Sequence, residues 1–362
     1  MTAVAVSPPL LSKKQLIALG AAAFLCCVVI PLLNAGLAAD SALHLPDYLL
    51  ALFGKFFCFA IVAVAMDLLW GYAGILSLGH GVFFALGGYA MGMYLLLAIG
   101  EAGVYRSKLP DFMVFLDWKE LPWFWRPFDS FGFALLAALL VPGLLAYVFG
   151  YFAFRSRIRG VYFSIMTQAF TFALMLLFFR NETGLGGNNG LTNFKHVYGY
   201  PLAEPSTKVA LYVLSAAGLL AAFVLCRFVV VSKAGRVLRA IRDAESRVMF
   251  SGYNPTSFKL FVYTLSAVLC GLAGALYVPQ VGIINPSELQ PSNSIEMAIW
   301  VAVGGRGSLI GGPLGAFVVN GAKSWFTVAV PELWLYVLGV LFIVVTLFLP
   351  QGLVGLWAKV KR

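Results

Sequence analysis

Few polar side chains interrupt the apolar runs of this sequence, and these few are the residues that could contact a polar solute. Glu296 opens a short apolar stretch, and Gln168 lies in the middle of a longer one. Polar groups in such runs are costly, so each either lines a pathway or bonds a neighbouring helix. Glu296 could equally be a carboxylate that faces the positive end of a helix dipole. Both interpretations stay open for these residues.

Glycine, serine and polar residues are concentrated in three segments, 71–81, 183–190 and 304–313. Glycine lets the backbone turn sharply, and irregular backbone at membrane depth is tolerated only inside protein or along a cavity. Transport proteins often place such breaks at the substrate pathway. The pathway candidates from these segments are Ser77, His80, Asn188, Asn189 and Ser308. Tight helix packing and, for the two asparagines, an ordinary turn are the alternatives.

Patterns that would indicate an enzyme or a metal protein are missing from the sequence. There is no H-E-x-x-H, G-x-S-x-G or Walker A motif, and no Asp/Glu/His series of the kind that proton-coupled carriers need. The five cysteines all fall inside apolar runs and form no C-x-x-C pair. We therefore expect no catalytic residue, metal or cofactor, and a pathway that suits neutral or zwitterionic solutes. If ATP drives the protein, another subunit must hydrolyse it.

The composition explains why so few polar groups are present. Of 362 residues, 61% are hydrophobic and 11% are charged, and the mean hydropathy is +0.90. Soluble domains carry about 25% charged residues, so the composition excludes a soluble, a disordered and a disulfide-scaffold protein. The apolar residues come in unbroken runs, whereas in β-barrels they alternate with polar ones. The sequence predicts an all-α polytopic membrane protein with about ten transmembrane helices and with broken or re-entrant segments.

Ten apolar segments are candidates to cross the bilayer, whose core of about 30 Å needs about 20 residues per helix. They are 15–38, 48–69, 81–99, 131–154, 161–179, 209–231, 260–278, the short 295–303, 309–326 and 333–349. The first could be a signal peptide, with Lys13 and Lys14 before it, but its long apolar run favours a retained helix. We expect a single membrane domain over 1–362, with a peripheral first helix over 15–38 and a core over 48–349.

Lysine and arginine are distributed unequally between the two faces of this arrangement. With the N-terminus inside, 15 of the 25 fall on the inner face and 7 on the outer face. The other three, Lys55, Arg227 and Lys323, lie near the ends of spans, where long side chains can reach the interface. This asymmetry follows the positive-inside rule and predicts that both termini are cytoplasmic. The net charge of +10 therefore indicates membrane sidedness and lipid contact rather than a nucleic-acid partner.

The most charged stretch, 232–257, lies between two spans on the predicted inner face. Apolar residues within it recur with a helical period and share one face. Arginines occupy the rest of the helix, which Gly252 and Pro255 end. A basic helix on anionic lipid and a docking helix for a cytoplasmic partner are equal alternatives at this point. The candidate docking residues are Arg236, Arg239, Ile241, Arg242, Asp243 and Glu245.

Several motifs together resemble the permeases of branched-chain amino acid ABC importers. They are G-Y-A-G at 71–74, S-L-G-H-G-V-F at 77–83, R-G-V-Y-F at 159–163, the basic run 235–243 and G-G-R-G-S-L at 304–309. The similarity covers Leu49 to Gly355. Within that family the chain is most similar to the second permease subunit of urea importers. The segments that carry this narrower likeness are 66–74, 166–169 and 178–190.

The resemblance implies a heterodimer of two related permeases, two cytoplasmic ATPases and a periplasmic solute-binding protein. It favours the docking role for 235–250, although Glu245-Ser246-Arg247 stands where importers more often have small residues. The expected function is an inner-membrane permease subunit that moves urea or short-chain amides by alternating access. A branched-chain amino acid importer and, from a different class, a passive urea channel are the alternatives. The outer loop 101–129 is a candidate seat for the binding protein.

Overall fold

The protein is described here by a computed structural model that covers residues 13–36, 41, 43–348 and 351–360. It is 77% helical, so the predicted all-α fold is confirmed. The strands of the described chain are each two residues long. They form two antiparallel pairs, β1 (Leu191–Thr192) with β4 (Ile283–Ile284) and β2 (His196–Val197) with β3 (Tyr200–Pro201).

Each of the ten predicted spans coincides with helix in the described chain. The helices are α1 (Lys13–Phe24), which continues through the π-helical turn Leu25–Val29 into α2 (Ile30–Ala35), α3 (Asp47–Asp67) with the π-helical turn Leu68–Tyr72, α4 (His80–Leu97), α6 (Phe131–Arg155), α7 (Val161–Phe179), α8 (Pro205–Val231), α10 (Pro255–Val281), α11 (Pro291–Gly304), α12 (Gly311–Ala329) and α13 (Trp334–Phe348). Three further helices are α5 (Asp111–Phe115), α9 (Lys233–Phe250) and α14 (Gly352–Val360). The non-helical residues 74–79 between α3 and α4 are called the broken link.

Seven of these helices are long and apolar enough to cross a membrane. They are the continuous helix α1–α2, α3 with its π-helical turn, α4, α6, α7, α8 and α10. Helices α11, α12 and α13 do not meet both conditions of length and hydropathy. Residues 37–38 and 349, at the ends of two predicted spans, lie outside the described residues.

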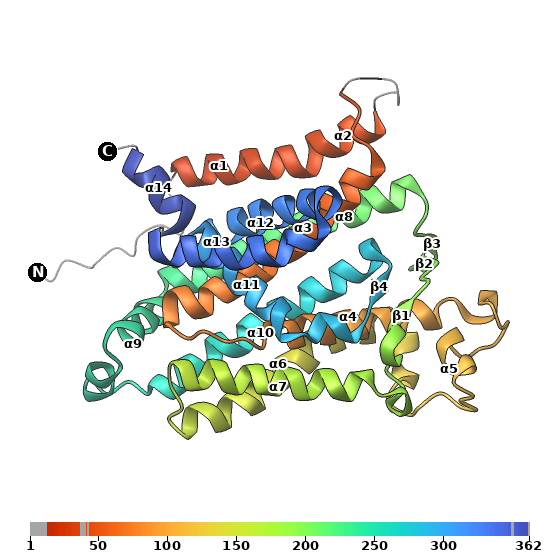
Figure 1. Cartoon of the computed structure of the whole chain (residues 1–362), viewed down its shortest axis with the longest axis horizontal. Coiled ribbons are helices and arrows are strands. Elements are labelled where there is room, and N and C mark those ends of the chain that lie inside the picture. The colour runs from red at the N-terminus through yellow and green to blue at the C-terminus, as the bar shows by residue number, and fades with distance from the viewer. Residues whose placement is uncertain (1–12, 37–40, 42, 349–350, 361–362) are drawn as a thin grey trace, which may run out of the picture.

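The long helices run roughly side by side, as Figure 1 shows. α9, α14 and the start of α1 lie at one end of this bundle, on the left of the view. α5 and the strands β2 and β3 lie at the other end. The two ends of the described chain therefore share the end of the bundle that carries the charged helix α9.

The centre of the bundle is built where α4, α6 and α10 approach closely. A methyl group on Gly274 of α10 would lie 1.9 Å from the carbonyl oxygen of Phe84, and one on Gly271 would lie 2.1 Å from that of Ala138. Backbone therefore packs against backbone on two sides of α10. Small residues allow this contact between helices in a membrane, where apolar burial alone does not drive their association.

The broken link passes through the protein beside α7, which supplies three hydroxyls on one helical face. Ser164 Oγ donates to the carbonyl of Leu76 at 2.8 Å, and the amide of Leu78 donates to Thr167 Oγ1 at 3.0 Å. Thr171 Oγ1 donates to the carbonyl of Leu78 at 3.1 Å. Backbone without helical bonds is costly at membrane depth unless the protein supplies partners. The hydroxyls of α7 supply them here.

We predict that Gly274→Ala destabilises the protein by about 1–3 kcal/mol, because the added methyl group forces α10 away from α4. The matched control is Gly321→Ala in α12, where a methyl group would meet no atom within 4 Å. Thermal unfolding of the purified full-length protein in detergent measures both variants. Equal melting temperatures for the two variants would contradict the close packing of α4 and α10.

Candidate functional site

A polar cavity of about 440 Å³ lies among α3, α10, α11 and α12. The turn Pro286–Leu289, between α10 and α11, contributes to its wall. The charged and amide side chains of the lining are Lys55, Glu288, Asn293, Glu296, Asn320 and Lys323. Two lysines and two glutamates give this lining no net formal charge. Such an interior suits a solute that is neutral or zwitterionic, because it neither attracts nor repels one sign of charge.

Glu296 and Lys323 form an ion pair within the cavity. Lys323 Nζ lies 3.0 Å and 2.7 Å from the two carboxylate oxygens of Glu296. α11 and α12 form a helical hairpin, so these residues meet although they are 27 positions apart in the chain. The side chain of Glu296 is only 8% exposed, whereas that of Lys323 is 39% exposed. A carboxylate buried this deeply needs a charged or hydrogen-bonded partner, which Lys323 provides.

Aromatic rings form another part of the lining. Lys55 Nζ lies 5.5 Å from the centre of the Phe59 ring and 5.9 Å from that of Tyr277, within the range of cation–π attraction. The hydroxyl of Tyr277 donates to Glu288 Oε1 at 3.3 Å. The indole N–H of Trp300 is buried and has no hydrogen-bond partner among the described residues. Trp300 is among the residues that line the cavity, and its ring lies 4.9 Å from that of Phe59.

Of the seven pathway candidates from the sequence, Glu296 lies in this cavity. His80 is fully buried and is hydrogen-bonded through Nε2 to Ser266 Oγ at 2.8 Å and through Nδ1 to the carbonyl of Ser77 at 3.3 Å. Ser77 Oγ accepts from the amide of Gly79 at 3.3 Å. His80 and Ser77 therefore fix the start of α4, and neither of them lines the polar cavity.

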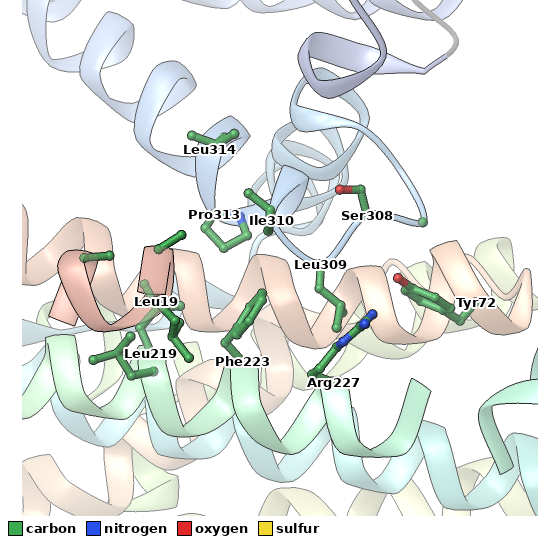
Figure 2. A pocket seen from close by; sticks show the side chains of 14 residues that line it. Leu19, Tyr72, Leu219, Phe223, Arg227, Ser308, Leu309, Ile310, Pro313 and Leu314 are labelled. Atoms are coloured by element: carbon green, nitrogen blue, oxygen red, sulfur yellow. The ribbon is translucent and has the colours of Figure 1, made fainter. Parts of the chain in front are cut away.

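The other four candidates lie apart from Glu296. Gln168 is half-buried on α7, and Asn188 and Asn189 are exposed in a short 3₁₀ turn. Ser308 lines a second, mostly apolar cavity between α1, α8 and the start of α12, shown in Figure 2. The structure therefore does not bring the seven candidates together into one site. A role for these four residues in transport stays a prediction.

Sequence reasoning missed Lys55, Glu288 and Lys323 as members of one site. The sequence indicated only that the two lysines are long side chains near span ends, and it did not single out Glu288. One signal was available, because all three lie near the same predicted membrane face as Glu296. What the sequence could not show is that α3 packs between α10 and the α11–α12 hairpin, which places their charges around one cavity.

The predicted docking segment forms a bent helix at one end of the bundle. α9 kinks at Ala244, whose φ of −158° and ψ of 75° are not helical. Ile241 is buried against the membrane domain, whereas Arg236 and Arg239 are exposed. A groove of about 520 Å³ follows the bend and is lined by Arg236, Asp243 and other residues of α9. The exposed arginines and this groove give α9 a surface that a partner protein could occupy.

Arg242 connects α9 to the end of α3. Its Nη1 donates to the carbonyl of Gly71 at 2.7 Å. Its Nε donates to Asp243 Oδ1 at 2.9 Å, and this bond holds the pKa of the Asp243 carboxyl below its ordinary value. On the same end of α3, Asp67 Oδ1 accepts from the amide of Gly307 at 2.7 Å. The end of α3 is therefore bonded both to α9 and to the loop that begins α12.

Glu245, another docking candidate, is held within the chain. Its carboxylate accepts from Lys259 Nζ of α10 at 2.6 Å and lies 3.5 Å from the guanidinium of Arg159. The side chain is 18% exposed. Glu245 thus fixes the second half of α9 to the membrane domain, and it presents less surface to a partner than Arg236 or Arg239 does.

A family model described as "Branched-chain amino acid transport system / permease component" matches residues 48–346 of this chain. The chain belongs to this family. It is accordingly a multi-pass membrane permease, a class of subunit that is not itself an enzyme. The matched residues run from the first residues of α3 to the last turn of α13.

Individual relatives of the permease agree with this membership. It is 25% identical to the high-affinity branched-chain amino acid transport system permease protein LivM of Salmonella typhimurium, over 82% of this chain and 67% of that protein. It is 24% identical to the probable branched-chain amino acid transport permease protein LivM of Methanocaldococcus jannaschii, over 86% of this chain and 94% of that protein. The ribose import permease protein RbsC of Escherichia coli is 25% identical over 52% of this chain and 58% of that protein. No solved structure matches the chain.

We predict that Lys323→Gln lowers the free energy of unfolding by about 1–3 kcal/mol, since it leaves the buried Glu296 carboxylate without its charged partner. The partial exposure of Lys323 keeps the loss below that of a fully buried pair. The double variant Glu296→Gln/Lys323→Gln is expected to recover part of the loss. A double-mutant cycle of thermal unfolding measures the coupling, and strictly additive effects would contradict the ion pair.

Proposed function

We propose that this permease is the membrane subunit of an ABC importer that moves urea or a short-chain amide inward by alternating access. The polar, charge-balanced cavity among α3, α10, α11 and α12 is the observation that carries the proposal. Membership of the permease family supports the importer part of the proposal. The partners are a second related permease, two cytoplasmic ATPases that bind and hydrolyse ATP, and a periplasmic solute-binding protein. The setting is the inner membrane, with both termini in the cytoplasm.

Urea fits the chemistry of the cavity because it is small, planar and uncharged. Its carbonyl needs hydrogen-bond donors, which the ammonium of Lys55 can supply. Its two amino groups need acceptors, and the carboxylate of Glu288 and the amide oxygen of Asn320 are in the same lining. The two lysines and two glutamates of the lining balance one another in charge. An ion of either sign therefore gains no net electrostatic advantage over a neutral solute in the cavity.

A branched-chain amino acid is the second candidate cargo, and specific observations favour it. Two relatives carry branched-chain amino acid transport in their names. The cavity also has an apolar side, formed in part by Phe56, Met297 and Val328, that could hold an aliphatic side chain. The α-carboxylate and α-ammonium of such a solute could exchange partners with Lys55 and Glu288.

Transport in this proposal begins at α9, which docks an ATPase subunit through its exposed arginines and its groove. Movement of α9 on ATP binding pulls on the end of α3 through the bond from Arg242 to Gly71. The bond from Gly307 to Asp67 passes the movement to α12. α12 carries Lys323, so the cavity opens or closes as α9 moves. A passive urea channel, the alternative from a different class, needs neither the groove nor these bonds.

We expect cells that lack this subunit to lose uptake of labelled urea and to retain uptake of labelled leucine. Reintroducing the full-length chain should restore urea uptake, and depleting cellular ATP should abolish it again. Loss of leucine uptake alone would overturn the urea assignment and favour the branched-chain amino acid cargo. Urea uptake that persists without ATP would favour the passive channel.

We expect Arg236→Glu/Arg239→Glu to reduce co-purification of the ATPase subunits by about tenfold or more, because reversing two exposed charges opposes electrostatic complementarity at the docking surface. Both side chains are exposed, so the stability of the permease should change by no more than about 0.5 kcal/mol for each substitution. Lys119→Glu, an exposed lysine in the loop at the opposite end of the bundle, is the control. Equal recovery of ATPase with both variants would refute the docking role of α9.

A further inference from the structure

The helix α9 consists of two parts that meet at Ala244. Residues 233–243 and 245–250 are helical, whereas the φ and ψ of Ala244 interrupt the helix between them. We call these parts the first arm and the second arm of α9. Leu238 is buried in the first arm and Val248 in the second, so each arm packs against the rest of the protein.

The two arms are bonded to different membrane helices. In the first arm, Arg242 donates to the carbonyl of Gly71 at the end of α3, at 2.7 Å. In the second arm, the carboxylate of Glu245 accepts from Lys259 Nζ, near the start of α10, at 2.6 Å. The same carboxylate lies 3.5 Å from the guanidinium of Arg159, just ahead of α7. The connections to α3 and to α10 therefore lie on opposite sides of the bend.

The bond between Glu245 and Lys259 is largely sheltered from water. Their side chains are 18% and 10% exposed, whereas that of Arg159 is 49% exposed. Solvent and salt screen the attraction between partly buried charges much less than that between exposed ones. Lys259 is therefore the main partner of Glu245, and this short ion pair holds the second arm to α10.

The helix α10 connects the second arm to the polar cavity. Lys259 lies near its start and Tyr277 near its end, roughly 27 Å apart along the axis at a rise of about 1.5 Å per residue. Tyr277 lines the polar cavity and donates to Glu288. Between these points α10 packs backbone to backbone against α4 and α6, and such close-packed contacts transmit strain. The first arm is connected to another wall of the cavity, because α3 carries Lys55.

The surroundings of the bend allow the angle between the arms to change. The groove on α9 is lined by Asp243 of the first arm and by Arg247 of the second, so a partner seated in it contacts both arms. A separate cavity of about 120 Å³ lies between α9, the broken link and the start of α7, and Ile241 and Glu245 are among its lining residues. A fully packed interior would resist a change in the bend, whereas this cavity leaves space for one.

We propose that Ala244 is a hinge and that Glu245 is the positioning residue that anchors the second arm to α10. A partner that occupies the groove changes the angle between the two arms. Because the second arm is held to α10, this change moves the first arm, and with it the end of α3, relative to α10. Two walls of the polar cavity then separate or approach. The inference rests on the proposed docking of ATPase subunits on α9.

The test compares solute transport with ATP hydrolysis in the complete transporter, reconstituted in liposomes and supplied in turn with labelled urea and labelled leucine. We expect Glu245→Gln to retain its ATPase subunits and to hydrolyse ATP, but to move about tenfold or more less solute per ATP. The reason is that an unanchored second arm takes up the movement without shifting α3 relative to α10. Glu182→Gln, which removes an exposed ion pair with Arg180, should couple transport to hydrolysis as the unaltered protein does.

Thermal unfolding separates this positioning role from a structural one. Glu245→Gln leaves the ammonium of Lys259 poorly partnered and should lower the melting temperature. The double variant Glu245→Gln/Lys259→Met removes that charge, so it should recover the melting temperature but not the solute moved per ATP. Recovery of both in the double variant, or unchanged solute per ATP in Glu245→Gln, would overturn this inference alone. An unaltered transporter that retains no ATPase, or moves neither solute, would overturn the proposed function and this inference with it.

Discussion

The structure depends on one constraint, which is that backbone leaving helical geometry inside a membrane protein must find hydrogen-bond partners within that protein. α3 ends in a π-helical turn, and the broken link follows it before α4 begins. Ser164, Thr167 and Thr171 of α7 bond this link. The carbonyl of Gly71, at the end of the preceding helix, accepts from Arg242 of α9. α7 and α9 thus both supply hydrogen-bond partners to the backbone in this region. The end of α3 and the broken link therefore form a joint that holds α3, α7 and α9 together.

This joint connects the charged surface of α9 to the helices that line the polar cavity. The helix end that Arg242 bonds also carries Asp67, whose carboxylate accepts from Gly307 ahead of α12. α3 and α12 then continue through the bundle and contribute Lys55 and Lys323 to the polar cavity. The same two helices thus reach both the α9 end and the cavity. The ion pair between Glu296 and Lys323 connects α12 to α11 beside the cavity.

The helices could be predicted from the sequence, because unbroken apolar runs of the required length in a chain of this composition form transmembrane helices and rarely any other structure. It also located the break before His80, since glycine and serine cluster there, and it singled out Glu296. It could not show that His80 bonds Ser266 rather than a solute, because that contact joins residues 186 positions apart. The partnership of Glu296 with Lys323 was hidden for a similar reason. A lysine near a span end has the same local pattern whether it reaches the interface or a carboxylate on the next helix.

The most direct test of this account is the distance between α9 and the end of α12 that carries Thr327 in the assembled transporter. Spin labels at Ser246→Cys and Thr327→Cys, both exposed positions, report it by electron double resonance in a chain whose Cys26 and Cys27 are replaced by serine. The account predicts that ATP binding shifts this distance and that Arg242→Gln removes the shift while the ATPases remain bound. A shift that persists unchanged in Arg242→Gln, or no shift in the unaltered transporter, would contradict it.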